Sequence, residues 1–469
     1  MSVPGWVQDS IFYQIFPDRF ANGRNDNNPK SVLPWNHKPT LYGFHGGDLK
    51  GIIDRMYYLL DLGVNAIYLN PIFLSPSNHR YNAIDYFQID PKLGSKVEFF
   101  TLLDVAHRNE MKVLLDGVFN HCGRGFFAFN DILENQAESP YLDWFHIKKF
   151  PVDAYSPGES TTYEAWWNYK SLPKFNTSNP EVQKFILHVA RYWIEQGIDG
   201  WRLDVPNEID DDEFWLRFRQ VVRNANPDAY LLGEIWDGDP RWVGNEHFDG
   251  LMNYPVRDLV IDLLTEKCKA SKFAHETLKW YSQYLPDNTR AMYNLLGSHD
   301  TERFMTKVEN NLAKAKLGYL FIFTFSGAPA IFYADEIGRL GAGDPDCRST
   351  FEWEESRWNT PLRDWIKKLI RLRKEKTCLR RGTYRLIENA LSDTTLAYCR
   401  VVDNDSAVVA MNISNSAAEI KIDLLGTGLE NCSRLRNLLA ADEYAVNDQS
   451  VVIRLPQYSG ALLQPVERL

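Results

Sequence analysis

The chain contains 469 residues, of which 44% are hydrophobic and 24% are charged, and it carries a formal net charge of −10. This composition is ordinary for a soluble globular protein, and the length predicts one large domain with appendages. Because the charge balance is acidic and no basic stripe is present, nucleic acid is excluded as the main partner. No apolar run is long enough to span a bilayer, which excludes a membrane-embedded protein.

The first ten residues lack a basic run followed by an apolar stretch, so no secretory leader is expected. Neither metal-like nor disulfide-like spacing is found among the cysteines, which are Cys122, Cys268, Cys347, Cys378, Cys399 and Cys432. Free thiols in a reducing compartment are therefore predicted, and with them a cytoplasmic location.

Between about residue 10 and about residue 335, short apolar runs alternate with amphipathic helical stretches. This is the pattern of parallel strands that are joined by helices. Strands are predicted at residues 11–16, 64–70, 112–118, 200–205, 230–235, 250–254, 291–296 and 330–333. Helices are predicted between them at residues 48–62, 101–109 and 181–196. Eight parallel strands surrounded by helices close a (β/α)8 TIM barrel, so the predicted fold class is α/β.

One connection is much longer than the others. About sixty residues rich in Pro, Asn and aromatic side chains separate the third strand from a helix that starts near Pro180. A structureless loop of that length is uncommon in a compact domain. Residues 119–178 are therefore predicted to fold as an inserted subdomain over one end of the barrel, which is then divided into residues 1–118 and 179–382.

The pattern of side chains changes after a helical stretch at residues 361–376. Polar and apolar side chains alternate in four later segments, at residues 397–400, 406–412, 419–424 and 450–455. This alternation is typical of antiparallel strands. Residues 383–469 are therefore predicted to form a carboxy-terminal antiparallel β-sandwich.

The stretch from Gly200 to Glu208 contains the first candidates for chemistry. Arg202 and Asp204 lie two residues apart on a predicted strand, so their side chains point to the same side. An arginine beside an aspartate favours the ionised carboxylate, which can serve as a nucleophile. Taken alone, such a pair is more often structural than catalytic.

Polar residues at the ends of other strands change that balance. The reactive groups of a TIM barrel cluster at the carboxyl ends of its strands, and Asp204, Glu234 and Asp300 end the predicted fourth, fifth and seventh strands. Three converging acids without a cysteine–histidine metal set indicate acid–base and covalent chemistry on an acetal. Each alone would more often be a solvated loop acid, and a lone His299 a satisfied core histidine, but the whole set is hard to obtain by chance.

The chain resembles the α-amylase superfamily of glycoside hydrolases in four short segments, at residues 116–121 (DGVFNH), 200–204 (GWRLD), 233–236 (GEIW) and 298–300 (SHD). The order and spacing of these segments match those of the family. Two further segments resemble the branch of cyclomaltodextrinases, neopullulanases and maltogenic amylases, at residues 172–176 (LPKFN) and 205–208 (VPNE).

The resemblance implies a retaining double displacement. Asp204 would attack the anomeric carbon, and Arg202 would keep its carboxylate charged. Glu234 would protonate the leaving oxygen and then deprotonate a water molecule, for which it needs a raised pKa that a less hydrated setting near Trp236 would provide. Asp300 would stabilise the oxocarbenium-like transition state. The carboxyls of the nucleophile and the acid would lie about 5 Å apart.

The same resemblance implies the residues that bind substrate. Tyr81 would stack on the sugar ring, and His121 and His299 would donate hydrogen bonds to it. The remaining candidates are Arg202, Trp236, Arg348 and, on the acceptor side, Glu208, Trp166 and Trp167.

The predicted function is hydrolysis of α-1,4-glucosidic bonds, and also of α-1,6 bonds, in cyclodextrins, maltooligosaccharides, pullulan or starch. Two alternatives stay open. One is a glucan transglycosylase, in which a sugar hydroxyl intercepts the same covalent intermediate. The other is a non-catalytic barrel that binds glucan or serves a transporter, although such relatives lose one or more of the acids that this chain keeps.

No cofactor is required by this chemistry, but the resemblance implies a structural calcium loop, with candidate ligands Asn22, Asp26, Asn27, Gly46 and Asp48. Arg24 and Asn28 replace acids in that loop, so an Asn-rich turn without metal is the alternative. Members of the branch usually dimerise through an extra amino-terminal β-domain. Because the barrel begins almost at residue 1, a monomer or a dimer that does not use that domain is expected.

Overall fold

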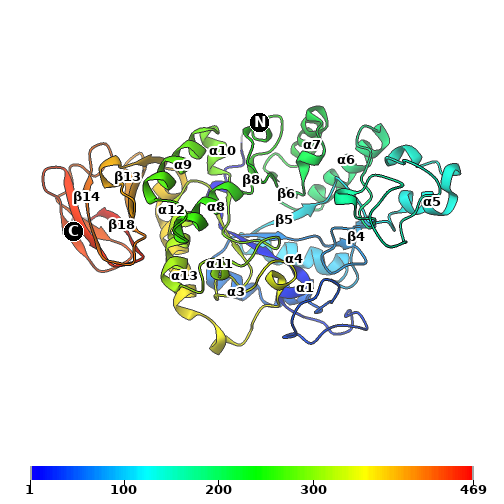
Figure 1. The fold of residues 1–469 in the computed structure, drawn as a ribbon, viewed down its shortest axis with the longest axis horizontal. Coiled ribbons are helices and arrows are strands. Elements are labelled where there is room, and N and C mark those ends of the chain that lie inside the picture. Colours follow the sequence, from blue (N-terminus) through cyan, green and yellow to red (C-terminus); the bar gives the residue numbers. More distant parts are fainter. Residues whose placement is uncertain (1–2, 467–469) are drawn as a thin grey trace.

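The computed structural model describes residues 3–466, and its central feature is a barrel of eight parallel strands (Figure 1). The strands are β1 (Phe12–Ile15), β2 (Ala66–Leu69), β5 (Lys112–Gly117), β6 (Gly200–Leu203), β7 (Tyr230–Gly233), β8 (Gly250–Leu251), β9 (Tyr293–Asn294) and β10 (Ala328–Phe332). They are hydrogen-bonded in the order β8-β7-β6-β5-β2-β1-β10-β9, and a parallel bridge between Met252 and Tyr293 joins the two ends. The predicted TIM barrel and all eight of its strands are confirmed.

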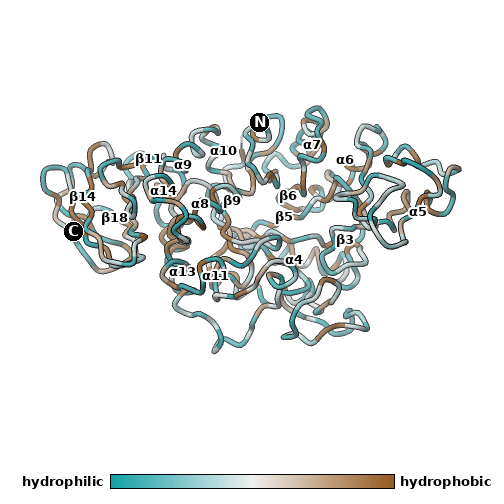
Figure 2. Tube along the Cα trace, in the orientation of Figure 1, coloured by the Kyte–Doolittle hydropathy of each residue, from teal (hydrophilic) through white to brown (hydrophobic). Residues whose placement is uncertain are grey.

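Side chains on the strands alternate between the inside of the barrel and the layer beneath the helices. On β1, Phe12 joins an inner cluster with Tyr230 and Tyr293, whose ring centroids lie 6.0 and 5.3 Å from its own. Its neighbour Tyr13 packs in the outer core instead. Figure 2 shows hydrophobic residues along the strands in the centre of the molecule, and hydrophilic residues in many of the peripheral loops. The packed barrel therefore acts as a rigid base for the loops at its carboxyl end.

Helices surround the barrel and cover its outer face. Their bounds are α1 (Pro17–Phe20), α2 (Leu49–Asp54), α3 (Met56–Leu62), α4 (Lys96–Arg108), α5 (Phe127–Asn135), α6 (Pro180–Glu195), α7 (Asp212–Ala225), α8 (Tyr254–Leu264), α9 (Ala270–Ser282), α10 (Pro286–Arg290), α11 (Phe304–Lys307), α12 (Leu312–Thr324), α13 (Thr360–Glu375) and α14 (Thr377–Arg381).

Two predicted helices differ from the structure. The helix predicted at residues 48–62 is divided into α2 and α3 at Arg55, whose guanidinium lies 4.1 Å from the centre of the Trp353 ring. Helix α4 begins at Lys96, before the predicted start at residue 101, because Ser95 and Glu98 form a capping box. The first difference comes with a tertiary contact, whereas the second was readable from the Ser-x-x-Glu spacing.

Residues between β5 and α6 fold over one side of the barrel, next to α6 (Figure 1). They contain α5 and short 3₁₀ helices, among them η4 (Trp166–Asn168), and an isolated bridge between His121 and Lys174 ties them to the end of β5. The inserted subdomain is thus present, while the division of the chain at residues 118, 178 and 382 stays a prediction. A hairpin of β3 (Phe73–Leu74) and β4 (Asp85–Ile89) precedes it and was not predicted.

The carboxy-terminal residues form antiparallel sheets at the far end of the molecule from α5 (Figure 1). The predicted sandwich is confirmed. Its strands are β11 (Thr383–Leu386), β12 (Thr395–Val402), β13 (Asp405–Asn412), β14 (Ala418–Asp423), β15 (Arg434–Asn437), β16 (Glu443–Ala445), β17 (Ser450–Leu455) and β18 (Ser459–Pro465). Six strands pair in the order β11-β12-β13-β18-β15-β16, and β14 pairs with β17. Of the helices described for residues 3–466, none has the length and hydropathy that a membrane crossing needs.

Candidate active site

One buried guanidinium organises the carboxyl ends of β5, β6 and β7. Arg202 Nη1 donates to Asp116 Oδ1 and to Asp204 Oδ1, each at 2.8 Å. Its Nη2 lies 2.7 Å from Glu234 Oε1, as an ion pair without hydrogen-bond alignment. The positive charge of Arg202 is therefore divided among three carboxyl groups.

The third acid, Asp300, approaches from the loop after β9. Its Oδ2 lies 3.0 Å from His299 Nε2 and its Oδ1 lies 3.2 Å from Arg348 Nη2. Arg348 also donates through Nε to the carbonyl oxygen of His299 at 2.8 Å. Asp300 is close enough to Glu234 and Asp204 to raise the pKa of both carboxyls. The structure thus brings the three predicted acids together in one site.

Aromatic and imidazole rings form the wall beside Asp300. The hydroxyl of Tyr81 donates to Asp116 Oδ2 at 2.8 Å and lies 2.6 Å from His299 Nε2. The rings of Tyr81 and His299 are stacked with centroids 5.4 Å apart. On the subdomain side, Trp166 stacks on His121, whose Nε2 is buried without a hydrogen-bond partner in the described residues. Such an unpaired nitrogen suits a hydroxyl of a bound ligand.

The backbone after Asp204 is strained. Val205 adopts φ 36° and ψ 51°, the left-handed region that a β-branched residue rarely enters. In this conformation its N–H donates to Glu234 Oε2 at 3.1 Å. Strain of this kind is typical of functional sites, because the surrounding structure must enforce it.

Burial and charge set the ionisation of the acids. Burial raises the pKa of Glu234 to about 7; Asp300 and Asp116 add to the rise, and Arg202 opposes it. Burial also raises the pKa of Asp204, against the pull of Arg202. Burial has the same tendency at Asp300, but His299 and Arg348 outweigh it and lower the pKa of that carboxyl.

The structure adds the physical causes behind two sequence-based expectations about these groups. Arg202 contacts Asp204 as expected and favours its ionised form, but burial and the neighbouring carboxyls outweigh that effect and raise the pKa of Asp204. The Trp236 ring is 46% exposed, and its Nε1 donates to Glu234 Oε1 at 3.3 Å. Burial raises the pKa of Glu234, in line with the expected poorly hydrated setting, whereas the hydrogen bond from Trp236 opposes that rise because it favours the ionised form.

Comparison with known proteins agrees with this geometry. Residues 14–360 match the family described as alpha amylase, catalytic domain. The chain belongs to the α-amylase family. It is 43% identical over 467 residues to a cyclomaltodextrinase of Geobacillus thermopakistaniensis, covering 99% of this chain and 78% of that protein. It is 45% identical over 415 residues to neopullulanase 2 of Thermoactinomyces vulgaris, covering 88% and 70%.

Among solved structures, the cyclic alpha-maltosyl-(1→6)-maltose hydrolase of Arthrobacter globiformis matches with a TM-score of 0.90 at 37% identity, and the match covers 99% of this chain and 100% of that one. The protein is therefore a glycoside hydrolase of the amylase family, as predicted.

The residues predicted for the acceptor side come from two segments, the loop after β6 and the 3₁₀ helix η4 of the inserted segment. Glu208 ends the 3₁₀ helix η5 (Pro206–Glu208), and its Oε2 is 3.3 Å from Lys174 Nζ of the inserted segment. Trp167 is 71% exposed and stacks on Trp166 with ring centroids 4.6 Å apart. The exposed ring of Trp236 stacks on Tyr254. These rings offer apolar faces for sugars.

Sequence reasoning missed a polar residue inside the barrel of this amylase-family chain. Gln14 on β1 lies fully buried, with Nε2 2.9 Å from His299 Nδ1. An amide that donates to Nδ1 leaves the proton of a neutral imidazole on Nε2, which faces Asp300. Burial lowers the pKa of His299, which is consistent with a neutral ring. A glutamine within an apolar strand was the signal available in the sequence.

The candidate calcium loop is held by protein donors. Asp48 Oδ1 accepts from the N–H groups of Gly23 and Gly51, and Oδ2 accepts from Arg24 N and Asn27 Nδ2. Arg24 forms an ion pair with Asp26 at 2.6 Å and another with Glu98 at 2.7 Å.

Asn22 donates to Asn28, and the N–H of Gly46 donates to Asp18. Within residues 3–466, no group of three or more His, Cys, Asp or Glu side chains is arranged to hold a metal. Asn27 Oδ1 is buried without a hydrogen-bond partner in the described residues, as a ligand oxygen of a cation would be. N–H groups nevertheless satisfy both oxygens of Asp48, and the guanidinium of Arg24 pairs with Asp26, so these contacts favour the Asn-rich turn, and calcium binding stays a prediction.

Removal of divalent metal is therefore expected to leave the fold intact. Dialysis against EDTA should change Tm by less than about 1 °C, since no cation binding energy is lost on unfolding. Replacing Arg24 with Gln should lower Tm, because Asp26 and Glu98 lose their cation. Differential scanning calorimetry with and without added calcium measures both effects. A Tm that falls by several degrees in EDTA and recovers with calcium would contradict this account of the loop.

Proposed function

We propose that the protein is a retaining hydrolase of α-1,4-glucosidic bonds, and also of α-1,6 bonds, in cyclodextrins, maltooligosaccharides, pullulan or starch. The observation that carries the proposal is the contact of one guanidinium, that of Arg202, with both Asp204 and Glu234. Sharing one small planar group keeps the two carboxyls near the separation of about 5–5.5 Å that retaining glycosidases use.

In the first step, Glu234 gives its proton to the glycosidic oxygen while the Asp204 carboxylate attacks the anomeric carbon. The bond between that carbon and the leaving oxygen breaks, and a covalent glucosyl ester forms. In the second step, the Glu234 carboxylate takes a proton from water, the water oxygen attacks the same carbon, and Asp204 leaves. Asp300 stays ionised and stabilises the positive charge of both transition states.

The two steps require that, before the reaction starts, Glu234 is protonated and Asp204 is ionised. Asp204 and Glu234 compete for it, since burial raises the pKa of both. Asp204 accepts an aligned hydrogen bond from Arg202, whereas the contact of Glu234 with the same group is not aligned. A hydrogen bond to the charged form favours that form, which supports an ionised Asp204 and a protonated Glu234.

The sugar at the cleavage point would stack on Tyr81 and receive hydrogen bonds from His121 and His299. Arg348 contacts Asp300 and would keep its carboxylate in place beside the sugar. The leaving portion of the glucan would lie over Trp236, next to the acid. A cytoplasmic location, and a monomer or a dimer, are part of the same proposal.

A second candidate activity is transfer of the glucosyl group to another sugar. The Lys174–Glu208 ion pair and the exposed Trp166–Trp167 stack favour it, because they form a polar and aromatic surface where an acceptor sugar would bind. Water and sugar then compete for one intermediate.

Replacing Glu208 with Gln should shift the ratio of transfer to hydrolysis more than it lowers total cleavage. The amide keeps the shape of the side chain but loses the charge that faces Lys174. Quantitative chromatography of the products from maltotriose measures the ratio, with Glu181→Gln on exposed α6 as the control. An unchanged product profile would argue against an acceptor-side role for Glu208.

The proposed function is tested by the products formed from β-cyclodextrin, pullulan, starch and maltotriose, compared side by side by chromatography. Proton NMR during the first turnovers gives the configuration of the new reducing end. A retaining enzyme forms the α-anomer first. Initial release of the β-anomer, or no cleavage of any of the four glucans, would overturn the proposal.

A further inference from the structure

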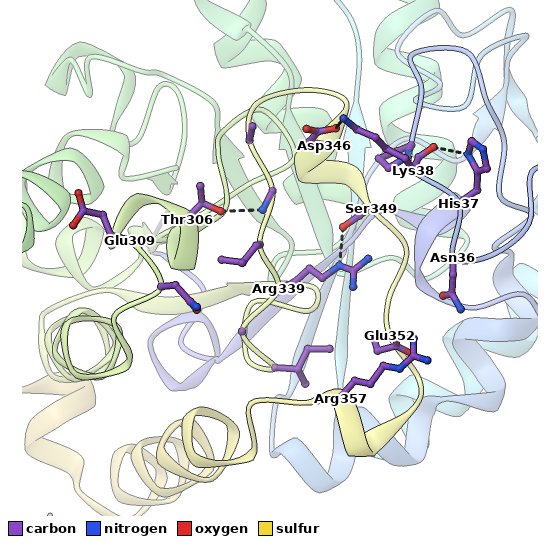
Figure 3. Close-up of a pocket in the computed structure, with 17 residues that line it drawn as sticks. Asn36, His37, Lys38, Thr306, Glu309, Arg339, Asp346, Ser349, Glu352 and Arg357 are labelled. Carbon is purple, nitrogen blue, oxygen red and sulfur yellow. Dashed lines mark hydrogen bonds and ion pairs between the residues drawn. The ribbon is translucent and has the colours of Figure 1, made fainter.

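A groove of about 900 Å³ lies beside the turn that carries Asp346 and Ser349 (Figure 3). Its walls come from residues 36–39, from α11 and the turn after it, and from residues 337–357. None of the three acids lines it. No Trp, Tyr or Phe ring lines it either, which distinguishes it from a surface built to hold a glucan chain.

One cation in this groove lacks an anionic partner. The guanidinium of Arg339 projects into the space (Figure 3), and its Nε donates to Ser349 Oγ at 2.9 Å. Among residues 3–466, no carboxylate lies within ion-pair distance of this guanidinium, and Glu352, whose charge acts on Arg339, pairs with Arg357. Burial and the neighbouring Arg303 lower the pKa of Arg339, whereas Tyr333 and Glu352 act in the opposite direction. A free planar fork of N–H donors is the group that binds phosphate most specifically.

Two of the acids in the groove are already compensated. Asp346 pairs with Lys38 at 3.4 Å and Glu352 pairs with Arg357 at 3.2 Å. The third, Glu309, is exposed and lies on the opposite side of the groove from the Arg339 guanidinium (Figure 3). The groove therefore has a cationic end at Arg339 and a hydrogen-bonding end at Glu309, Asn310 and Thr306.

We propose that this groove binds a sugar phosphate, with the phosphate on the Arg339 guanidinium and the sugar hydroxyls on Glu309 and Asn310. A ligand with an anion at one end and hydroxyls at the other matches both ends of the groove. A free inorganic phosphate would use only the first.

The groove is connected to the active site through the turn at residues 341–349. Ser349, which Arg339 contacts, follows Arg348, and Arg348 contacts Asp300. The N–H of Gly341 donates to Thr306 Oγ1 at 2.9 Å, and the N–H of Arg303 donates to the Gly341 carbonyl at 3.0 Å. A phosphate that binds the Arg339 guanidinium would compete with Ser349 for it and so alter the position of this turn. Because Arg348 lies in the same turn, the binding of substrate next to Asp300 would change as well. This last step rests on the proposed function, whereas the binding itself does not.

Isothermal titration calorimetry of the full chain with glucose 6-phosphate, inorganic phosphate and glucose tests the binding. Glucose 6-phosphate is expected to bind more tightly than phosphate, and glucose should give no signal at the same concentration. Arg339→Gln should weaken binding of the sugar phosphate by about tenfold or more, since a charge-assisted fork is lost. Arg371→Gln, an exposed arginine on α13 outside the groove, is the matched control and should bind as the wild type does.

A second variant keeps the test decisive should Arg339→Gln fail to fold. Glu309→Gln should weaken binding of glucose 6-phosphate and leave that of inorganic phosphate unchanged. Absent binding to the wild type, equal binding to a folded Arg339→Gln protein, or phosphate that binds as tightly as the sugar phosphate would each overturn the proposal. Calorimetry measures binding and does not depend on turnover. A protein that binds glucose 6-phosphate but cleaves no glucan would therefore contradict the proposed function and leave the binding proposal intact.

Discussion

Replacing Glu234 with Gln is expected to lower kcat on maltotriose by about 10²–10⁴-fold, the usual contribution of a positioned general acid. Glutamine preserves the shape of the side chain, and its one carbonyl oxygen can still accept from either Val205 N or Trp236 Nε1, but it has no acidic proton to give. A substrate whose leaving group needs no proton, such as a maltosyl fluoride, should lose much less in the first step. Stopped assays on both substrates measure the difference, with Glu181→Gln as the surface control.

The raised pKa of Glu234 also predicts how kcat/KM depends on pH. Because Glu234 must be protonated and its pKa is raised to about 7, kcat/KM should fall as the pH rises above 7. In the glutamine variant this alkaline limb should disappear. An unchanged limb near pH 7, or a near-normal rate on maltotriose, would refute the assignment of Glu234 as the acid.

Much of the fold could be predicted because it depends on local hydrophobic patterns. The barrel strands are buried on both faces, so they read as short apolar runs between turns. The elements and boundaries that the sequence did not predict are short or depend on contacts with residues far away in the chain. Strand β3 has only two residues and is set by its pairing with β4, and the division of α2 from α3 comes with the contact of Arg55 with Trp353. Such contacts leave no periodic signal.

The candidate site, like the fold, could be predicted only in part. The identity of the acids could be predicted because a TIM barrel places the ends of its strands together. The physical causes of their charge states could not, because these depend on burial and on how many carboxyls share one cation. Arg202 beside Asp204 reads as a simple pair in the sequence, yet Asp116 and Glu234 also contact it. In the Asn22–Asn28 loop, Arg24 was seen as a departure, but its role as the cation of the loop needed the contacts with Asp26 and Glu98.

Replacing Asp204 with Asn is expected to have the largest effect, a loss of about 10⁴- to 10⁶-fold in kcat, which is the range for removal of a covalent nucleophile. An amide cannot form the glucosyl ester, so a good leaving group will not rescue this variant as it rescues the glutamine variant of Glu234. The substitution also leaves Arg202 with two carboxyl neighbours in place of three. More of its charge then acts on Glu234, so the pKa of that carboxyl should fall and any residual alkaline limb should move to lower pH.

The covalent role of Asp204 can be tested without relying on a rate. A fluorinated glucosyl fluoride slows the second step more than the first, so the intermediate accumulates on the wild-type enzyme. Peptide mass spectrometry should find the sugar on Asp204, and the asparagine variant should carry none. A sugar attached to Glu234 or Asp300 would assign the nucleophile elsewhere. If no adduct forms while the substrate is still consumed, the reaction proceeds by direct attack of water, and Asp204 would act only through its charge beside Arg202.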